Sequence, residues 1–211
     1  MSDIRAYIRD ALAAYSKGAY NRVHASKRGE LYVLDWFTTQ ALEGRAFQVR
    51  AGTITAPLTG DVAITDTFAE MCADVASGTT IIPVYLNGHV ESLNGGTLPE
   101  IAAKSVATVS SAGAAFTPLP LDSGGPAAAS TARVAGAGGV TVTAELATTT
   151  LRHFANLVAV AGDVILADHL FRMPPKLRGP RCFYVQIAGA VAGPLYFAHF
   201  DYIEIPTASI D

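Results

Sequence analysis

Residues 181–206 read RCFYVQIAGAVAGPLYFAHFDYIEIP, and this segment decides the fold that we expect. β-Branched and aromatic residues fill both of its halves, while Gly and Pro interrupt its centre, so it predicts two successive strands joined by a turn. Because side chains alternate along a strand, Phe197 and His199 point away from Phe200 and Tyr202. The second strand therefore has two distinct faces.

The same pattern extends back to Glu30. Short segments of β-branched and aromatic residues are separated by Gly, Pro, Asn and Asp, which is typical of a sandwich or barrel. The predicted strands are Leu31–Thr39, Ala46–Thr55, Val62–Thr65, Thr80–Leu86, His89–Leu93, Ala102–Ser110, Ala132–Val134, Val140–Leu146, Asn156–Ala161, Cys182–Ala188 and Leu195–Ile205. These strands predict a mainly β protein with two packed antiparallel sheets, and 211 residues can bury such a core as one main domain.

Other local signals refine this prediction. Asn87-Gly88 predicts a two-residue hairpin turn, because both residue types tolerate the positive φ of a type I′ turn. The segment Pro118–Pro126 predicts an ordered loop, since proline lacks a hydrogen-bond donor and the Gly pair within it favours turning. Three segments are expected to form short connecting helices, namely Glu70–Ala76, Pro99–Lys104 and Thr149–Asn156.

The first 28 residues differ from the rest of the chain in charge. They hold six basic against two acidic side chains, a net charge of +4, whereas the other 183 residues hold 9 basic and 16 acidic ones, a net charge of −7. Ser2 can cap a helix whose apolar stripe consists of Ile4, Ile8, Leu12 and Tyr15. We therefore expect a basic helical arm over residues 1–28 and a β-sandwich domain over residues 29–211.

The role of this arm stays open at the level of sequence. Its cations fit nucleic-acid phosphates, an anionic lipid surface or an acidic neighbouring subunit, and they equally fit a solvated helix that covers its own domain. Charges at the start of the chain, without an apolar run, argue against a secretory signal and for synthesis in a cytoplasm. Apolar runs such as Ala188–Ala198 are broken by Gly and Pro and are shorter than the roughly 20 residues of a membrane span.

Two further segments predict contacts with partners. Ser105–Thr150 contains 46 residues rich in Ala, Gly, Thr, Ser and Val, and its only charged residues are Asp122, Arg133 and Glu145. Exposed segments normally carry more charge for solubility, so we expect a partner to cover this tract. The second segment is a proline-rich loop, and its basic residues, which fit a neighbouring subunit, anionic lipid, nucleic acid or plain solvation, are Arg172, Lys176, Arg178 and Arg181.

Metal and catalytic signatures are weak. The five His residues are scattered, and Cys72 and Cys182 are 110 positions apart, which favours two buried free thiols over a metal site or a disulfide framework. Asp168 and His169 are adjacent and so point to opposite faces of a strand. His199 and Asp201 can share a face, but no Gly-x-Ser-x-Gly nucleophile accompanies them. We expect no cofactor, no metal and no enzymatic activity.

The strand pattern, the low charge and the aromatic final strands resemble the single jelly-roll capsid proteins of viruses over about residues 30–206. The resemblance implies two facing four-stranded sheets, with loops and terminal arms that bind identical subunits and other capsid proteins in a virion. The N-terminal arm is shorter and less basic than the Arg-rich arms that package RNA, so contact with nucleic acid or with an inner membrane is left unsupported.

Two alternatives to a capsid subunit remain. The first is a receptor- or carbohydrate-binding β-sandwich module of a spike or fibre, with Trp36, Tyr side chains and loop acids as its ligand surface. Tyr32 and Trp36, four residues apart on a predicted strand, are better explained as core anchors than as a sugar platform. The second alternative is a β-sandwich enzyme that uses His199 and nearby acids, and it predicts a concave site that gathers distant polar groups.

Overall fold

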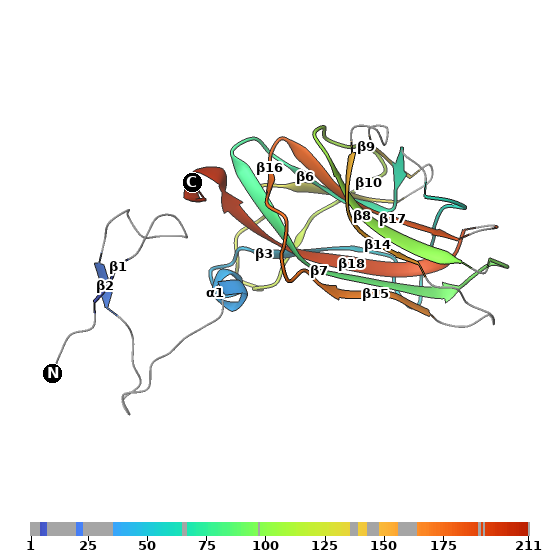
Figure 1. The fold of residues 1–211 in the computed structure, drawn as a ribbon, viewed down its shortest axis with the longest axis horizontal. Coiled ribbons are helices and arrows are strands. Elements are labelled where there is room, and N and C mark those ends of the chain that lie inside the picture. The colour runs from blue at the N-terminus through green and yellow to red at the C-terminus, as the bar shows by residue number, and fades with distance from the viewer. Residues whose placement is uncertain are drawn as a thin grey trace, which may run out of the picture.

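The computed structural model describes residues 5–7, 20–22, 36–64, 67–96, 98–135, 139–142, 148–155, 164–189, 191 and 193–210. Within them the fold is mainly β, its sheets pair antiparallel strands, and the one α-helix of this described part is α1 (Trp36–Leu42) (Figure 1). A 3-10 turn, η2 (Thr207–Ser209), ends the described chain. The prediction of a mainly β, antiparallel fold is confirmed.

Two large sheets make up most of the structure. We call the first the β17 sheet, and its strands in spatial order are β10 (Ala114–Phe116), β12 (Thr131–Val134), β6 (Met71–Val75), β17 (Arg181–Gly189), β8 (Pro99–Val106) and β14 (Thr148–Ala155). The second is the β18 sheet, with the order β11 (Leu119–Pro120), β3 (Ala46–Ala51), β18 (Leu195–Pro206), β7 (Thr79–Ser92) and β15 (Val164–Leu170). Two short strands join the β18 sheet, namely β4 (Leu58–Thr59), which pairs with β18, and β16 (Leu177–Arg178), which pairs with β7.

Two smaller sheets complete the described fold. The β13 sheet has the order β5 (Phe68–Ala69), β13 (Val140–Thr141) and β9 (Ser111–Ala112). The other small sheet pairs β1 (Arg5–Tyr7) with β2 (Tyr20–Arg22). The predicted N-terminal helix is therefore wrong at Arg5–Tyr7. An isolated amphipathic helix is marginal in water, and here the backbone bonds to a second segment instead.

The C-terminal segment, residues 181–206, supplies a central strand to each large sheet. β17 lies between β6 and β8, and β18 lies between β3 and β7. The two strands follow each other in the chain but pair in different sheets, so they do not form a hairpin with each other. Phe200 and Tyr202 are buried while Phe197 and His199 are partly exposed, which confirms the predicted alternation.

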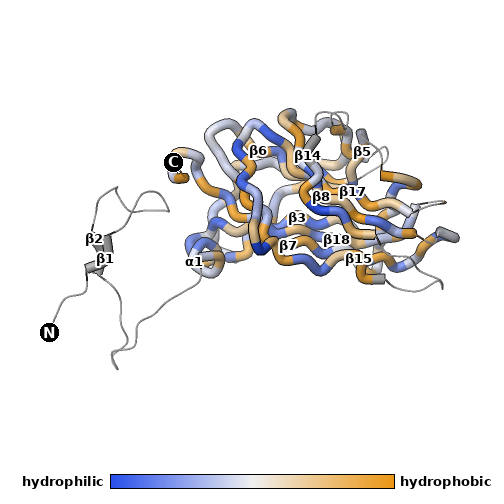
Figure 2. Tube along the Cα trace, viewed as in Figure 1, coloured by the Kyte–Doolittle hydropathy of each residue, from blue (hydrophilic) through white to orange (hydrophobic). Residues whose placement is uncertain are grey.

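A single hydrophobic core joins the inner faces of the two large sheets. Phe183 of β17 meets Phe200 of β18 edge to face, with ring centroids 4.9 Å apart. Phe47 and Tyr202 extend the same cluster. Burying each such side chain contributes about 1.5–3 kcal/mol, and Figure 2 shows apolar residues interspersed with polar ones along the strands of the β18 sheet. The apolar side chains on the inward face of each strand therefore form the contact between the two sheets.

Each large sheet is also covered on part of its outer face. Ala69 of β5 and Val140 of β13 pack against Cys182 and Tyr184, which is why β17 is buried on both faces. On the β18 sheet, Trp36 of α1 packs near Ile203. The helix α1 begins within the predicted strand Leu31–Thr39. That predicted strand is wrong from Trp36 onwards, because the apolar side of α1 has a sheet to cover; residues 31–35 lie outside the described part.

The predicted hairpin at Asn87-Gly88 is also wrong. β7 runs without a turn for 14 residues, and Gly88 pairs with Ala167 of β15 and Ala198 of β18. A Cβ atom at Gly88 would lie 2.7 Å from Cδ1 of Ile101, so this glycine lies where the two large sheets approach closely.

The three predicted connecting helices are strands. Glu70–Ala76 contains β6, Pro99–Lys104 lies within β8, and Thr149–Asn156 falls on β14 as far as the described residues extend. β6 and β8 are buried on both faces, so their sequences lack the alternation that distinguishes a strand from a short buried helix.

The remaining predictions had mixed outcomes. Residues 62–64 do not form the strand predicted at Val62–Thr65, and the described strand within Val140–Leu146 is confined to Val140–Thr141. Residues 156–161 lie outside the described part, and β15 was not predicted. No helix in the described part of the chain has the length and apolar composition that crossing a bilayer requires.

Candidate functional site

The middle of the low-charge segment, which contains β10, β11 and β12, lies along one edge of both large sheets. β11 pairs with β3 and β12 pairs with β6, and β3 and β6 are themselves in contact. We call residues 107–135 the edge tract; its only charged residues are Asp122 and Arg133. That a partner covers this segment stays a prediction; the structure places its strands β11 and β12 against the edges of the protein's own sheets.

Much of the edge tract nevertheless faces outwards. Val109 is 57% exposed and Leu121 is 50% exposed. Ala115 and Thr117 are exposed as well, and both line a groove of about 400 Å³ on the tract. The tract therefore presents a surface with few charges, on which Asp122 is exposed and Arg133 lines the groove.

Hydrogen bonds fix the tract to β18. The Glu204 carboxylate accepts one bond from the Ala129 backbone N–H at 2.6 Å and another from the Ser130 N–H at 2.9 Å. The Ser130 and Tyr202 hydroxyls form a buried hydrogen bond of 2.7 Å, and burial raises the pKa of Tyr202. At the other end, the Leu121 N–H donates to the Ala46 carbonyl at 2.9 Å.

The opposite edge of the two sheets is charged. On β14, His153 lies 2.8 Å from the Glu100 carboxylate, and Arg152 donates to Nε2 of His169 on β15 at 3.1 Å. Burial and, after it, the nearby Arg152 lower the pKa of His169. The Arg152 guanidinium also lies 5.5 Å from the ring centre of Phe171. In the described residues, the outermost strands thus differ in charge: β14 and β15 carry Arg152 and Asp168, whereas β10 and β11 carry no charged side chain.

The predicted basic loop runs beside β7 on this charged side. The Phe171 N–H donates to the Val84 carbonyl at 2.8 Å, and β16 pairs with Thr80 and Ile81 further along. The loop therefore covers part of the sheet edge that β15 leaves open. Three of the four predicted contact residues are exposed there, namely Arg172, Lys176 and Arg178.

The other predicted contact residues are placed differently or not described. Arg181 begins β17 and is partly buried, and its Nη1 donates to the Ser105 hydroxyl at 3.4 Å. The structure thus separates Arg181 from the exposed cations of the loop. Ile4, Ile8, Leu12 and Tyr15 lie outside the described residues.

His199 and Asp201 share the outer face of the β18 sheet, as the sequence predicted. Gln48 donates to Oδ1 of Asp201 at 2.9 Å, and the rings of His199 and Tyr85 are 5.6 Å apart. Burial raises the pKa of Asp201, while the bond from Gln48 and the proximity of His199 oppose this shift. Asp168 accepts a 2.6 Å bond from the Tyr85 hydroxyl, so it is separate from His169, which binds Arg152.

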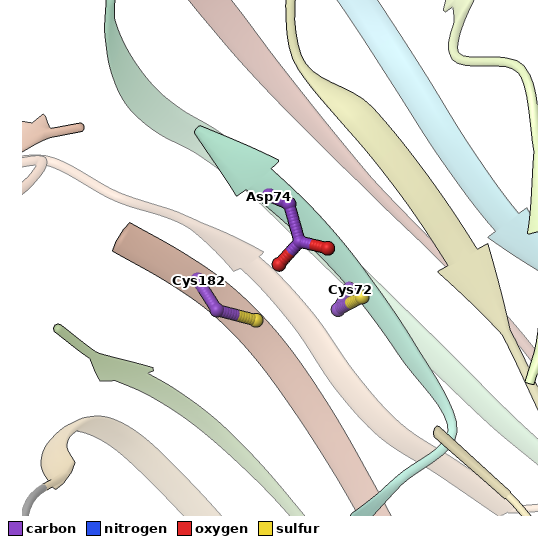
Figure 3. A group of neighbouring side chains, drawn as sticks. All are labelled: Cys72, Asp74 and Cys182. Carbon is purple, nitrogen blue, oxygen red and sulfur yellow. The ribbon is translucent and has the colours of Figure 1, made fainter. Parts of the chain in front are cut away.

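Sequence reasoning missed a cluster beneath the β13 sheet. Cys72 and Asp74 lie on β6, Cys182 lies on β17, and their sulfur and carboxylate oxygen atoms all lie within 4.8 Å of one another (Figure 3). Both thiols are free and buried, as predicted. A hydrogen bond with Cys72, together with burial, raises the pKa of Cys182 well above its ordinary value. The available signal was Cys72-x-Asp74, whose spacing puts both side chains on one face of a strand.

The sequence also gave no indication of a buried carboxylate pair. Glu70 is only 3% exposed, and its Oε2 accepts a 2.7 Å bond from the Ile187 N–H. Burial and the neighbouring Asp61 raise the pKa of Glu70 well above 4.5. Both acids line a pocket of about 360 Å³. Tyr196, whose pKa is raised by burial and by these two acids, has a buried hydroxyl without a hydrogen-bond partner in the described part of the structure. The pair can therefore retain a proton at a pH where an exposed carboxylate has lost it.

The function of this protein has to be inferred from the geometry of the surfaces and clusters described above. No protein-family model, curated protein or solved structure matches the chain.

Proposed function

We propose that this chain is a virion structural protein, a non-enzymatic capsid subunit of the jelly-roll type that assembles with identical copies. The edge tract is the main contact surface in this proposal. Residues 1–28 and the basic loop provide additional contacts with neighbouring subunits. The observation that carries the proposal is that the outermost strands at one edge of both sheets, β10 and β11, carry no charged side chain, and that much of the tract around them is exposed.

The strand order supports the jelly-roll assignment. When the eight principal strands are numbered in chain order, β3, β6, β7, β8, β14, β15, β17 and β18 become strands one to eight. The β18 sheet then contains the order 1-8-3-6, and the β17 sheet contains 2-7-4-5. First pairs with eighth, second with seventh, third with sixth and fourth with fifth. This nested pairing is the arrangement of two facing four-stranded sheets in a jelly roll.

A jelly roll alone does not define a function, because the same fold serves lectins, cupins and capsid proteins. The difference between the two sheet edges is more informative. β10 is the last strand on the uncharged side of the β17 sheet, and its residues Ala114–Phe116 carry no charge. Natural proteins usually protect a sheet edge with charged residues, since an unprotected edge can pair with another chain. Residues on β14 and β15 follow that rule, whereas β10 does not.

The composition of the edge tract favours repeated contacts. Ala, Gly and Ser lose little side-chain entropy on burial and allow backbones to approach closely. A standard interface buries about 1,600 Å², and with roughly half of it apolar the gross gain is about 20 kcal/mol. Association costs of about 4–15 kcal/mol offset much of this gain. Contacts of modest net strength are sufficient when a closed shell repeats them.

Introduced charge tests this proposal. We expect the full chain to form large closed particles, measured by size-exclusion chromatography with light scattering and by negative-stain microscopy. Thr117→Glu and Ala127→Glu, both at exposed positions that line the groove, should shift the chain to monomers or small oligomers, because a carboxylate buried in an apolar contact is costly. Ala56→Glu, at an exposed turn outside the tract, is the matched control and should leave assembly unchanged.

Circular dichroism of each variant separates loss of assembly from loss of folding. A wild-type chain that stays monomeric at high concentration would reject the proposal. The same conclusion would follow if the two edge-tract variants, correctly folded, assembled like the wild type.

A ligand-binding module of a spike or fibre is the second candidate. It is favoured by the outer face of the β18 sheet, where His89 stacks on Phe197 with ring centres 4.9 Å apart and Tyr85 lies beside His199. Trp36 does not belong to this face as an open platform, because it packs partly buried on α1. A small, stable oligomer that binds a glycan, with affinity lost in Phe197→Ala, would favour this function over a capsid subunit.

A further inference from the structure

We propose that Cys72, Cys182 and Asp74 form a binding site for one Zn²⁺ ion, with two sulfur ligands and one oxygen ligand. The expectation that the chain lacks a metal site rested on sequence spacing. The pairing of β6 with β17 removes that objection, since Cys182 is directly opposite Asp74 and Cys72 is two residues further along the same face. This inference does not depend on the capsid proposal.

The separations are close to those of a zinc site. Zinc binds sulfur at about 2.3 Å and carboxylate oxygen at about 2.0–2.2 Å, which places tetrahedral ligands roughly 3.5–3.8 Å apart. The three ligand atoms already lie within 4.8 Å of one another. Rotation of the side chains by a fraction of a rotamer well can supply the remaining approach, so no backbone rearrangement is needed.

Asp74 is held in place by a partner on a third segment. The Ser110 N–H donates to Oδ1 of Asp74 at 2.7 Å, and the Ser110 hydroxyl donates to Oδ2 at 2.6 Å. Each carboxylate oxygen has two lone pairs, so both oxygens retain the capacity to bind a cation. Hydrogen bonds of this kind orient the ligands of natural metal sites. The Ser110 hydroxyl also lies 3.1 Å from the Cys72 sulfur, so it contacts two of the three proposed ligands.

The charges of the site balance when zinc is bound. Each thiol loses its proton to solvent as its sulfur binds the metal, which leaves two thiolates and one carboxylate around a divalent cation. One negative charge remains, and the Arg133 guanidinium, whose Nε lies 4.0 Å from Oδ2 of Asp74, offsets it. Arg133 is partly exposed, so the cluster lies close to solvent on this side.

Zinc at this position would connect three parts of the fold. Its ligands come from β6 and β17, and Ser110 lies near the start of the edge tract. The metal would therefore fix the position at which the tract leaves the β17 sheet. Three protein ligands are one fewer than a closed structural zinc site has, so a water molecule would complete the tetrahedron; we infer a structural role because the donors are buried.

The test uses the full chain, reduced with a phosphine and freed of metal by a chelator. We expect one Zn²⁺ per chain by mass spectrometry of the metal, a raised Tm, and a thiolate-to-metal charge-transfer band when Cd²⁺ or Co²⁺ replaces zinc. X-ray absorption of the zinc form should show two sulfur neighbours. Ser110→Ala should weaken binding by about 10–100-fold, as loss of a ligand's hydrogen-bond partner does elsewhere.

Variants distinguish this site from adventitious binding. Cys72→Ser and Cys182→Ser should abolish the charge-transfer band, whereas His153→Asn, at the exposed His153–Glu100 pair, should bind like the wild type. If the cysteine variants do not fold, the sulfur count from X-ray absorption still decides. Binding without sulfur neighbours, no binding by the reduced chain, or a Cys72–Cys182 disulfide in the chain trapped directly from cells would overturn the proposal.

Discussion

Glu204 is one of two β18 side chains that hold the edge tract, the other being Tyr202, so its removal should loosen the tract at Ala129 and Ser130. In Glu204→Ala, the Ala129 and Ser130 N–H groups lose their acceptors at 2.6 and 2.9 Å. A hydrogen bond to a charged group contributes about 1.5–3 kcal/mol when it is shielded from water. Glu204 is partly exposed and water can replace it, so we expect a loss of about 2 kcal/mol for both bonds together.

Two measurements test this magnitude. With a urea m-value of about 1–3 kcal/mol per M, the unfolding midpoint should fall by roughly 1 M. Amide exchange at Ala129 and Ser130 should become about 30-fold faster, because 1.4 kcal/mol corresponds to a factor of ten. Amides in the centre of β17 are the control, because their exchange reports global unfolding and not the local release of the edge tract from Glu204. Glu204→Gln keeps one acceptor and should lose less stability.

The reasoning fails if exchange at Ala129 and Ser130 is unchanged in Glu204→Ala while the chain remains folded. It also fails if Glu204→Gln and Glu204→Ala destabilise the chain equally, since the retained acceptor would then have no effect.

Two further predictions concern the fold itself. Gly193 and Gly95 both have positive φ, but a Cβ atom at Gly193 would lie 2.0 Å from the Gly60 carbonyl oxygen, whereas one at Gly95 meets nothing within 4 Å. Chemical denaturation should therefore show a loss of about 1–2 kcal/mol for Gly95→Ala and a further 1–3 kcal/mol for Gly193→Ala; equal losses would contradict the packing argument. The raised pKa of Glu70 means that its contribution to stability is complete below its unfolded pKa of about 4.3 and declines as the pH rises towards its folded pKa. Glu70→Gln should therefore lose less stability than the wild type as the pH rises above about 4.3, measured by urea unfolding, and identical pH profiles would show that Glu70 is not responsible.

Local alternation was the part of the fold that could be predicted well. Phe200 and Tyr202 are buried and His199 is not, because successive side chains on a strand point to opposite faces whatever the strand pairs with. Prediction failed for β6 and β8, where both faces are buried and the alternation is lost. It failed at Asn87-Gly88 for a related reason, since a glycine required by close packing of two sheets has the same residue signature as a turn.

The candidate sites also divide into those that a single strand determines and those that depend on how strands pair. The shared face of His199 and Asp201 could be predicted because the two residues belong to one strand. The meeting of Cys72 with Cys182 could not, because it requires the register between β6 and β17. The carboxylate pair of Asp61 and Glu70 likewise depends on where two connecting segments meet β17.

The amino-acid sequence was sufficient to predict that this protein is mainly β, to favour two buried free thiols, and to show that one long segment has almost no charge. These properties follow from residue type and from the period of two along an extended backbone. Three features became visible only in the folded chain: β17 and β18 lie in different sheets, β10 to β12 cover one edge of both sheets, and two thiols and a carboxylate converge. Such pairings join residues far apart in the chain, and they depend on how the faces of two sheets fit together, which the local pattern does not record.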